Sequence, residues 1–168
     1  GGAYGGDGAD SSRENGGNAY GSIINPTKIG SGGGYNGYSR SGDGGGAAIL
    51  DIAGTLKVNG PITADGLPGQ DETRESGGGA GGTINIKAQT ITGNSTITAN
   101  GGRTYGGGGA GAGGRIALKY NTLDPSIVIT AYGGENADRS GAAGTIYKKP
   151  NSQTYPDLII DNNNNGIN

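Results

Sequence analysis

The chain has 168 residues, 41 of them glycine and 6 proline, and it carries a formal net charge of -2 at pH 7. Leu, Ile, Val and Phe together supply 25 residues, too few for the core of an ordinary globular domain of this length. The sequence contains no Cys, His, Met or Trp, which excludes disulfides, thiolate and imidazole metal sites, and most nucleophilic catalysis.

A flexible linker has a similar composition, but two features of the sequence argue against one. The low net charge leaves little self-repulsion to hold the chain open. The Ile, Leu and Val residues are grouped in short runs separated by glycine, whereas a linker would disperse them. No apolar run is long enough to span a membrane, and the scattered Lys and Arg residues form no patch for nucleic acid.

In chain order, residues 1–41 are predicted to be a glycine-rich, irregular N-terminal segment, with one strand near residues 21–24 and a turn at Asn25-Pro26. From residue 42 to 168 a strand, a turn, a second strand and a glycine-rich stretch recur. The expected repeats cover about 42–80, 81–113, 114–143 and 144–168. The clearest sign is a shared second strand: Ile62-Thr63-Ala64-Asp65-Gly66, Ile97-Thr98-Ala99-Asn100-Gly101 and Ile129-Thr130-Ala131-Tyr132-Gly133.

The strands alternate apolar and polar residues with a period of two, which indicates one buried and one solvated face. Ile84 and Ile86 are expected to point inward with Ile116 and Leu118, while Ala117 and the lysines point outward. Two buried columns are predicted, one of Leu50, Ile84, Ile116 and Ile146, the other of Ile62, Ile97 and Ile129. The fold class is therefore predicted to be all-β, a right-handed parallel β-helix (β-solenoid) with long glycine-rich loops. An antiparallel β-sandwich is the alternative.

The glycine-rich stretches, such as residues 76–82 and 105–114, have two interpretations. They are either flexible loops that bulge from each coil, or close-packed extended chain of polyproline II type, in which only glycine lets backbones approach. Because the glycines recur at one place in each repeat, the stretches should gather on one side of the stack. Ordered packing is the favoured interpretation.

Two short motifs suggest calcium. Residues 161–166 fit the first half of a calcium-binding loop, with Asp161, Asn163 and Asn165 as oxygen ligands and Gly166 at the turn, although a polar turn is the competing interpretation. Residues 5–10 match a single copy of the G-G-x-G-x-D repeat, which normally works in tandem. No cofactor is expected apart from this calcium alternative.

Carboxylates near one another in sequence are the remaining candidates for chemistry. They are Asp7, Asp10, Asp71 and Glu72. They lie in predicted loops with no basic partner arrangement, so solvated loop charges are expected and the chain is not expected to be an enzyme.

The repeats at 30–34, 44–50, 58–66, 108–118 and 143–147 resemble the glycine-rich modules of large bacterial surface and secreted adhesin-like proteins with parallel β-helix folds. The resemblance implies an extracellular or cell-surface location and a non-catalytic structural module of a fibre or adhesin. Self-association or stacking on neighbouring repeats of a longer chain is expected, because exposed strand edges invite pairing. The alternatives are a module that displays a face to a glycan or another surface, using the aligned Thr63, Thr98 and Thr130, and, less favoured, a polysaccharide-active β-helix enzyme.

Overall fold

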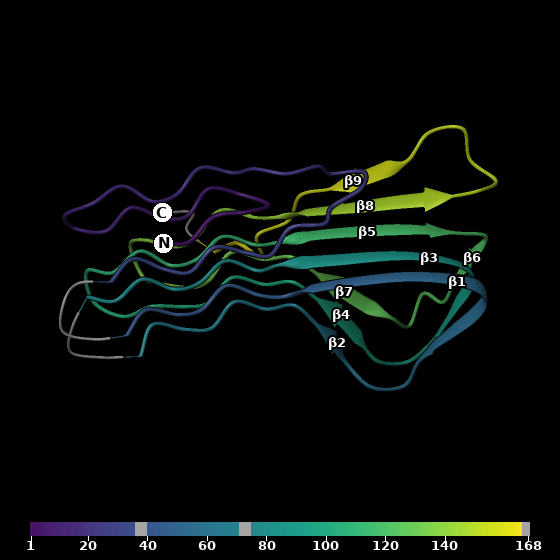
Figure 1. Cartoon of the computed structure of the whole chain (residues 1–168), viewed down its shortest axis with the longest axis horizontal. Coiled ribbons are helices and arrows are strands. Elements are labelled where there is room, and N and C mark those ends of the chain that lie inside the picture. Colours follow the sequence, from purple (N-terminus) through teal and green to yellow (C-terminus); the bar gives the residue numbers. More distant parts are fainter. Residues whose placement is uncertain (36–39, 71–74, 166–168) are drawn as a thin grey trace.

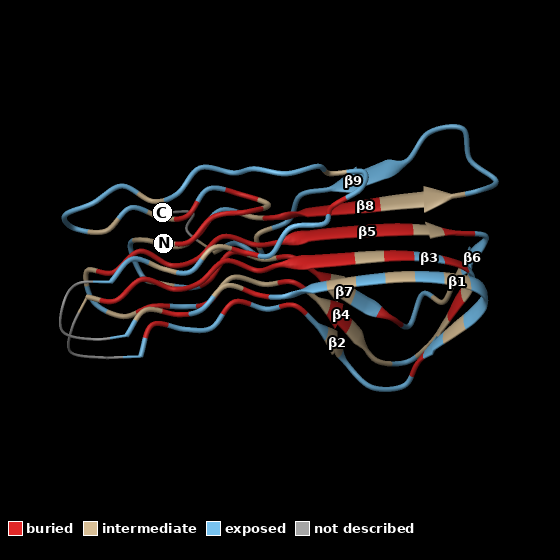
Figure 2. Cartoon of the chain, in the orientation of Figure 1, coloured by how far each residue is buried: buried red, intermediate tan, exposed pale blue. Residues whose placement is uncertain are grey.

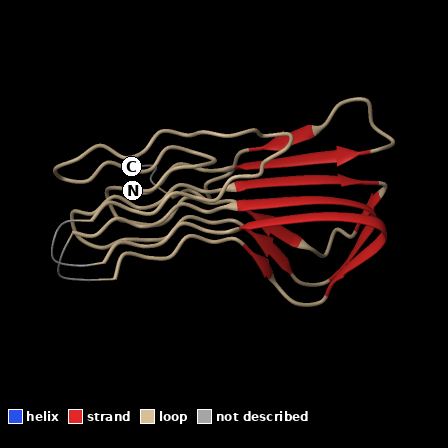
Figure 3. Cartoon of the chain, in the orientation of Figure 1, coloured by secondary structure: helices blue, strands red, loops and turns tan. Residues whose placement is uncertain are grey.

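The computed structural model describes residues 1–35, 40–70 and 75–165 and shows a β-solenoid of about three turns with no helix among those residues (Figures 1 and 3). Each turn contributes strands at one end of the molecule and glycine-rich extended chain at the other. The strands are β1 (Ala47–Val58), β2 (Ile62–Thr63), β3 (Thr83–Gly93), β4 (Thr96–Thr98), β5 (Arg115–Tyr120), β6 (Thr122–Leu123), β7 (Val128–Thr130), β8 (Thr145–Pro150) and β9 (Asp157–Ile159).

The strands form two sheets that face each other across the core. The larger sheet has the order β1-β3-β5-β8-β9, with β6 also paired to β3, and the smaller sheet has the order β2-β4-β7. Every pairing is parallel except that of β8 with β9. Parallel pairing of equivalent strands from successive turns confirms the predicted solenoid and makes the antiparallel sandwich wrong.

The core is a stack of aliphatic side chains from successive coils. Figure 2 shows that β3 and β5, in the middle of the larger sheet, are among the most buried strands. Ile84, Ile86, Ile116 and Leu118 are fully buried, as predicted. Ile62, Ile97 and Ile129 stack in register along the smaller sheet, which confirms that column.

The other predicted column is wrong by two residues at its first member. Leu50 pairs with Ile86, while Ala48 pairs with Ile84. A shift of two residues keeps every side chain on the same face, so the period-two pattern could not detect it. The register follows instead from the last glycine before each strand, since Thr83 N–H donates to Gly46 O and Arg115 N–H donates to Gly82 O.

The glycine-rich stretches form an ordered bundle beside the strands. Segments of extended chain from successive turns run side by side here, and we call them together the glycine bundle (Figure 1). The bundle consists of residues 1–9, 16–20, 30–34, 42–46, 64–69, 76–82, 99–104, 108–114, 131–135 and 141–144. Residues 76–82 at its centre are buried throughout. Their backbone bonds to six neighbouring segments, namely 1–9, 30–34, 42–46, 64–69, 99–104 and 108–114.

The hydrogen bonds of residues 76–82 repeat every three residues. Gly77 and Ala80 donate to residues 30–34, Gly78 and Gly81 donate to 108–114, and Gly79 and Gly82 donate to 64–69. Three residues per turn without internal hydrogen bonds is the geometry of the polyproline II helix. In an isolated polyproline II helix water solvates the backbone N–H and C=O groups, whereas here neighbouring segments bond to them. The glycine-rich stretches are therefore ordered and closely packed, and they are not flexible loops.

Glycine is required in the bundle because neighbouring backbones approach too closely for a side chain. A Cβ atom at Gly79 would lie 2.1 Å from the carbonyl oxygen of Asp43, and one at Gly111 would lie 2.0 Å from that of Gly79. Neither glycine has a left-handed φ. The requirement is therefore one of space and not of backbone conformation.

Residues 20–29 cross the outer face of the larger sheet as a strap. Their carbonyl groups accept hydrogen bonds from three side chains of the sheet: Tyr20 O from Arg115 Nε, Pro26 O from Asn85 Nδ2 and Lys28 O from Thr83 Oγ1. The strand predicted near residues 21–24 does not form, because this segment bonds to side chains rather than to a strand edge. Ala117, predicted to point to solvent, is fully buried in the covered part of the sheet.

Candidate functional site

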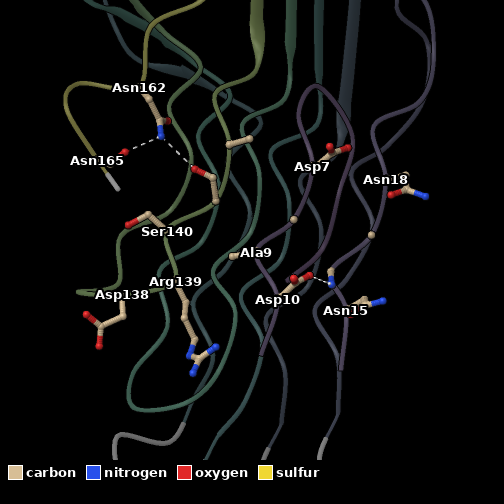
Figure 4. A pocket seen from close by; sticks show the side chains of 15 residues that line it. Asp7, Ala9, Asp10, Asn15, Asn18, Asp138, Arg139, Ser140, Asn162 and Asn165 are labelled. Carbon is tan, nitrogen blue, oxygen red and sulfur yellow. Dashed lines mark hydrogen bonds between the residues drawn. The ribbon is translucent and has the colours of Figure 1, made fainter. Parts of the chain in front are cut away.

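One hollow on the surface is open and polar, with a volume of about 800 Å³ (Figure 4). Three parts of the chain surround it: residues 7–18, the loop at 138–142, and the asparagine-rich tract near residue 162. The side chains that surround it belong to Asp7, Asp10, Asn15, Asn18, Asp138, Arg139, Ser140, Asn162 and Asn165, apart from the alanines. The rest of its lining consists of glycines and alanines of the glycine bundle, and none of its lining residues belongs to the hydrophobic core cluster.

Several of these polar groups hold the local backbone. Asp7 Oδ1 accepts a hydrogen bond from Ala19 N, and Asp10 Oδ1 accepts one from Gly16 N at 2.7 Å. Ser140 Oγ donates to Asn136 O at 2.7 Å. The two carboxylates therefore stabilise the turn between residues 7 and 19, and Ser140 stabilises the loop at residue 136.

Four other side chains of the hollow, those of Asn15, Asn18, Asp138 and Arg139, make no hydrogen bond or ion pair with any described residue. Together they present amide, carboxylate and guanidinium groups around an open, shallow surface. Such a mixture of donors and acceptors complements the hydroxyl groups of a polyol better than it complements an apolar ligand.

The predicted calcium ligands lie in the tract that borders this hollow. Asp161 Oδ1 accepts the backbone N–H of Asn163, and the side-chain amide of Asn165 donates to Gly133 O at 3.2 Å. Asn163 and Asn164 have left-handed φ values of 50° and 60°, so the tract turns sharply. Gly166 lies outside the described residues. The calcium site stays a prediction.

Sequence reasoning missed Asn162, which makes the closest contacts between this tract and the glycine bundle. Its Oδ1 accepts the N–H of Gly133 at 2.7 Å, and its Nδ2 donates to Gly141 O at 3.0 Å. Asn162 occupies a position at which the calcium-loop pattern allows any residue, so the pattern selected only its neighbours as candidate ligands.

The remaining acidic candidates are dispersed. Asp7 and Asp10 both lie at the hollow, whereas Asp71 and Glu72 lie outside the described residues. Within the described ranges, no cluster of three or more His, Cys, Asp or Glu side chains is arranged to hold a metal ion. Of residues 5–10, all but Asp10 belong to the glycine bundle, and Gly5 N–H donates to Gly113 O.

The threonine row of the smaller sheet is aligned as expected, but of its members only Thr63 is exposed, while Thr98 is half-buried and Thr130 is buried. Thr63 pairs with Thr98, which pairs with Thr130. A parallel row of polar contacts follows it, since Asp65 Oδ1 accepts Asn100 N–H and Asn100 Oδ1 accepts Tyr132 N–H. Asp65 Oδ2 also accepts the hydroxyl of Thr98 at 2.9 Å. These side chains join successive coils to one another.

A second polar cluster, which no sequence motif indicated, lies buried beneath the strap. The Tyr4 hydroxyl and Thr83 Oγ1 are 2.6 Å apart, and the Arg115 guanidinium lies 5.5 Å from the centre of the Tyr4 ring. Arg115 is 6% exposed, and its Nη1 donates to Thr145 Oγ1. Burial lowers the pKa of Arg115, and the neighbouring Tyr4 opposes that shift. The cluster attaches the N-terminal part of the chain to the sheet.

The described residues include no helix with the length and hydrophobicity that crossing a bilayer requires. No family model, curated protein sequence or solved structure matches this chain.

Proposed function

We propose that this chain is a non-catalytic structural module of an extracellular or cell-surface adhesin-like protein, in which it serves as a stiff spacer. The proposal depends on one observation. The backbone of residues 76–82, the central segment of the glycine bundle, is hydrogen-bonded to six surrounding segments of the same chain. The adhesin-like context comes from the resemblance of the repeats to surface-protein modules.

Stiffness follows from how the bundle is held together. Flexible regions of proteins have exposed backbone hydrogen bonds and low local packing. Residues 76–82 and 108–114 show the opposite, since all of them are buried and most of their N–H and C=O groups bond to other segments of the chain. Bending the bundle would break several of these bonds together, which favours a role in bearing load or holding distance.

Amide hydrogen exchange tests the structural role directly. We expect the amides of Gly78, Gly79, Gly81 and Gly111 to exchange about as slowly as those of the core strands, because they open only with the whole bundle. The amide of Gly60, an exposed residue between β1 and β2 that donates no backbone hydrogen bond to a described residue, provides an unprotected reference within the same chain. Exchange of the bundle amides at the rate of unstructured glycine would refute the spacer role.

The location is tested separately. An antibody raised against the purified chain should label intact, non-permeabilised source cells or recover the protein from the culture medium. Labelling that appears only after permeabilisation would contradict an extracellular location while leaving the structural role intact.

A glycan-binding display module is the second candidate, favoured by the unengaged side chains of the polar hollow. Soluble oligosaccharides of defined composition should raise the thermal unfolding temperature of the chain if this role is correct. Replacing Asn15, Asn18 and Arg139 together by alanine should abolish that rise. Because these side chains hold no other described residue, the variant should fold normally, and an unchanged response to sugar would exclude this hollow as the site.

A further inference from the structure

We infer that the glycine bundle is closed at both ends, so that the module has a fixed length and does not polymerise by end-to-end stacking of its coils. The inference refines the proposed structural role, on which it rests, and it limits the self-association expected from the sequence. Separate observations at the two ends carry it.

At the last coil, which contributes a strand to the larger sheet only, one side chain replaces the backbone that would follow in a regular repeat. In the earlier coils the N–H of Gly66 donates to Asn100 O of the next coil, and the N–H of Gly101 donates to Tyr132 O. The equivalent Gly133 N–H donates to the side-chain oxygen of Asn162 at 2.7 Å.

The N–H group of the same Asn162 side-chain amide replaces a second backbone hydrogen bond. Gly79 O accepts from Gly102 N–H, which lies at the other end of the same coil, and Gly111 O accepts from Gly134 N–H in the same way. The equivalent Gly141 O accepts from Asn162 Nδ2 at 3.0 Å. A side-chain amide has the donor and acceptor of a peptide group, so Asn162 makes both bonds that the second half of the fourth coil would have made in a regular repeat.

The neighbouring strand edge is also occupied at this end. β9 pairs with β8 in the antiparallel direction, with Ile146 opposite Ile159 and Lys148 opposite Asp157. A further coil would have to pair with β8 in the parallel direction, as every earlier coil does. The reversed strand therefore blocks continuation of the larger sheet.

At the first coil, glycine is missing from the positions where stacking demands it. In later coils, a Cβ atom at Gly79, Gly111 or Gly141 would lie 2.0 to 2.1 Å from the carbonyl oxygen of the preceding coil. The equivalent residue of the first coil, three positions before Gly46, is Asp43, which is exposed. Its side chain therefore projects to where a preceding backbone would lie.

The second bundle layer ends in the same way. A Cβ atom at Gly102 would lie 2.0 Å from Leu67 O, and one at Gly134 would lie 2.1 Å from Gly102 O. The first-coil equivalent is Leu67, whose side chain is 50% exposed. Two adjacent layers thus present side chains that cannot fit at the close spacing of the bundle.

The edge of β1 carries features that oppose pairing with another strand. Its register shifts between Ile52 and Thr55, and the strand exposes Asp51 and Lys57 on either side of that irregularity. Irregular edges and charged side chains are ways in which proteins prevent edge-to-edge association.

Head-to-tail filaments form when one end of a subunit accepts the other end of the next. Here the last-coil end is satisfied by Asn162 and β9, and the first-coil end is obstructed by Asp43 and Leu67. Repeat arrays need such terminal caps to remain soluble. A second copy or a partner therefore reaches the module through its sides, and adjoining modules connect through the chain rather than through stacked coils.

Light scattering coupled to gel filtration, with negative-stain microscopy, tests the inference on the full chain. We expect the monomer mass of 16.4 kDa from micromolar to millimolar concentration, with no fibres. A mass that rises with concentration through coil stacking, or fibres of constant width, would overturn it. If bundle amides remain protected while fibres form, this inference fails and the proposed structural role survives; unprotected amides would remove both.

A cap variant tests the role assigned to Asn162. In Asn162→Ala the Gly133 amide should exchange about 2- to 10-fold faster, the range expected for losing one hydrogen bond. Gly101, which bonds to a backbone oxygen, should be unchanged. Asn94→Ala, at an exposed turn residue, is the matched control. Unchanged exchange at Gly133 would overturn the assignment of Asn162 as the cap.

Discussion

Substituting Gly82 by alanine should destabilise the protein, whereas the same substitution at Gly46 should not. The two glycines occupy equivalent positions in successive coils, since Thr83 follows Gly82 and pairs with Ala47, which follows Gly46. A Cβ atom at Gly82 would lie 1.9 Å from Gly46 O, while one at Gly46 would meet nothing within 4 Å. The pair therefore isolates the effect of close backbone approach.

The magnitude follows from the displaced contacts. Ordinary van der Waals contact begins at 3.4 Å, so the coils would have to separate locally by about 1.5 Å. That movement strains the packing, at about 1–3 kcal/mol. It also breaks the bonds from Gly82 N–H to Ala64 O and from Thr83 N–H to Gly46 O, each worth about 0.5–1.5 kcal/mol. The expected loss in unfolding free energy is about 2–6 kcal/mol, a large share of a typical total.

Gly46→Ala should instead stabilise the chain by about 0.4–1 kcal/mol, because alanine restricts the unfolded state and the site has room for it. Denaturant unfolding followed by circular dichroism measures both variants, with midpoints compared at unchanged slope. If the glycine stretches were flexible loops, both substitutions would be neutral or stabilising. Equal stability of the two variants would therefore refute the close-packed bundle.

Three further predictions test other parts of the structure. Ile97 is the fully buried member of the isoleucine column in the smaller sheet, so Ile97→Ala should lower the unfolding free energy by about 2–5 kcal/mol. A loss below about 1 kcal/mol would contradict a shared core. Arg115 donates hydrogen bonds from Nε to Tyr20 O and from Nη1 to Thr145 Oγ1, and the lysine of Arg115→Lys cannot make both. Limited proteolysis should therefore cleave the strap at residues 20–29 faster in this variant than in the parent protein. Equal cleavage would show that Arg115 does not hold the strap. Hydrogen bonds from Ser126 hold the pKa of Asp124 below its usual 3.8. The charged carboxylate therefore stabilises the fold above that pH, and this stabilisation is lost as the pH falls. Asp124→Asn should make the unfolding free energy depend less on pH in the acid range, and an unchanged dependence would contradict the stabilising role of Asp124.

Much of the strand region could be predicted from the sequence. The period-two alternation in residues such as Ile84 and Ile86 identifies the buried face, and the recurrence of Ile62, Ile97 and Ile129 identifies the stack. These features are local or strictly repeated, so they survive in the sequence as a pattern. The register of Leu50 could not be read in this way, because moving a strand by two residues leaves the pattern unchanged.

The hollow and the cap were much less accessible from the sequence. Asp7, Asp10 and Asn162 come from opposite ends of the chain and meet only because the bundle brings residues 1–9 beside residues 141–144. The calcium-loop pattern selected Asp161, Asn163 and Asn165 by their spacing, but spacing carries no information on which side chain faces Gly133. Arg115 likewise appears as an ordinary strand residue until the strap covers it.

By itself, the sequence determined that the chain repeats, that the repeats contain short strands with one apolar face, and that glycine collects between them. The tertiary structure alone decided that the glycine stretches pack as a bundle and where that bundle ends. The physical reason is that a glycine shows only the absence of a side chain. Whether that absence serves flexibility or the approach of another backbone depends on which segments become neighbours when the chain folds.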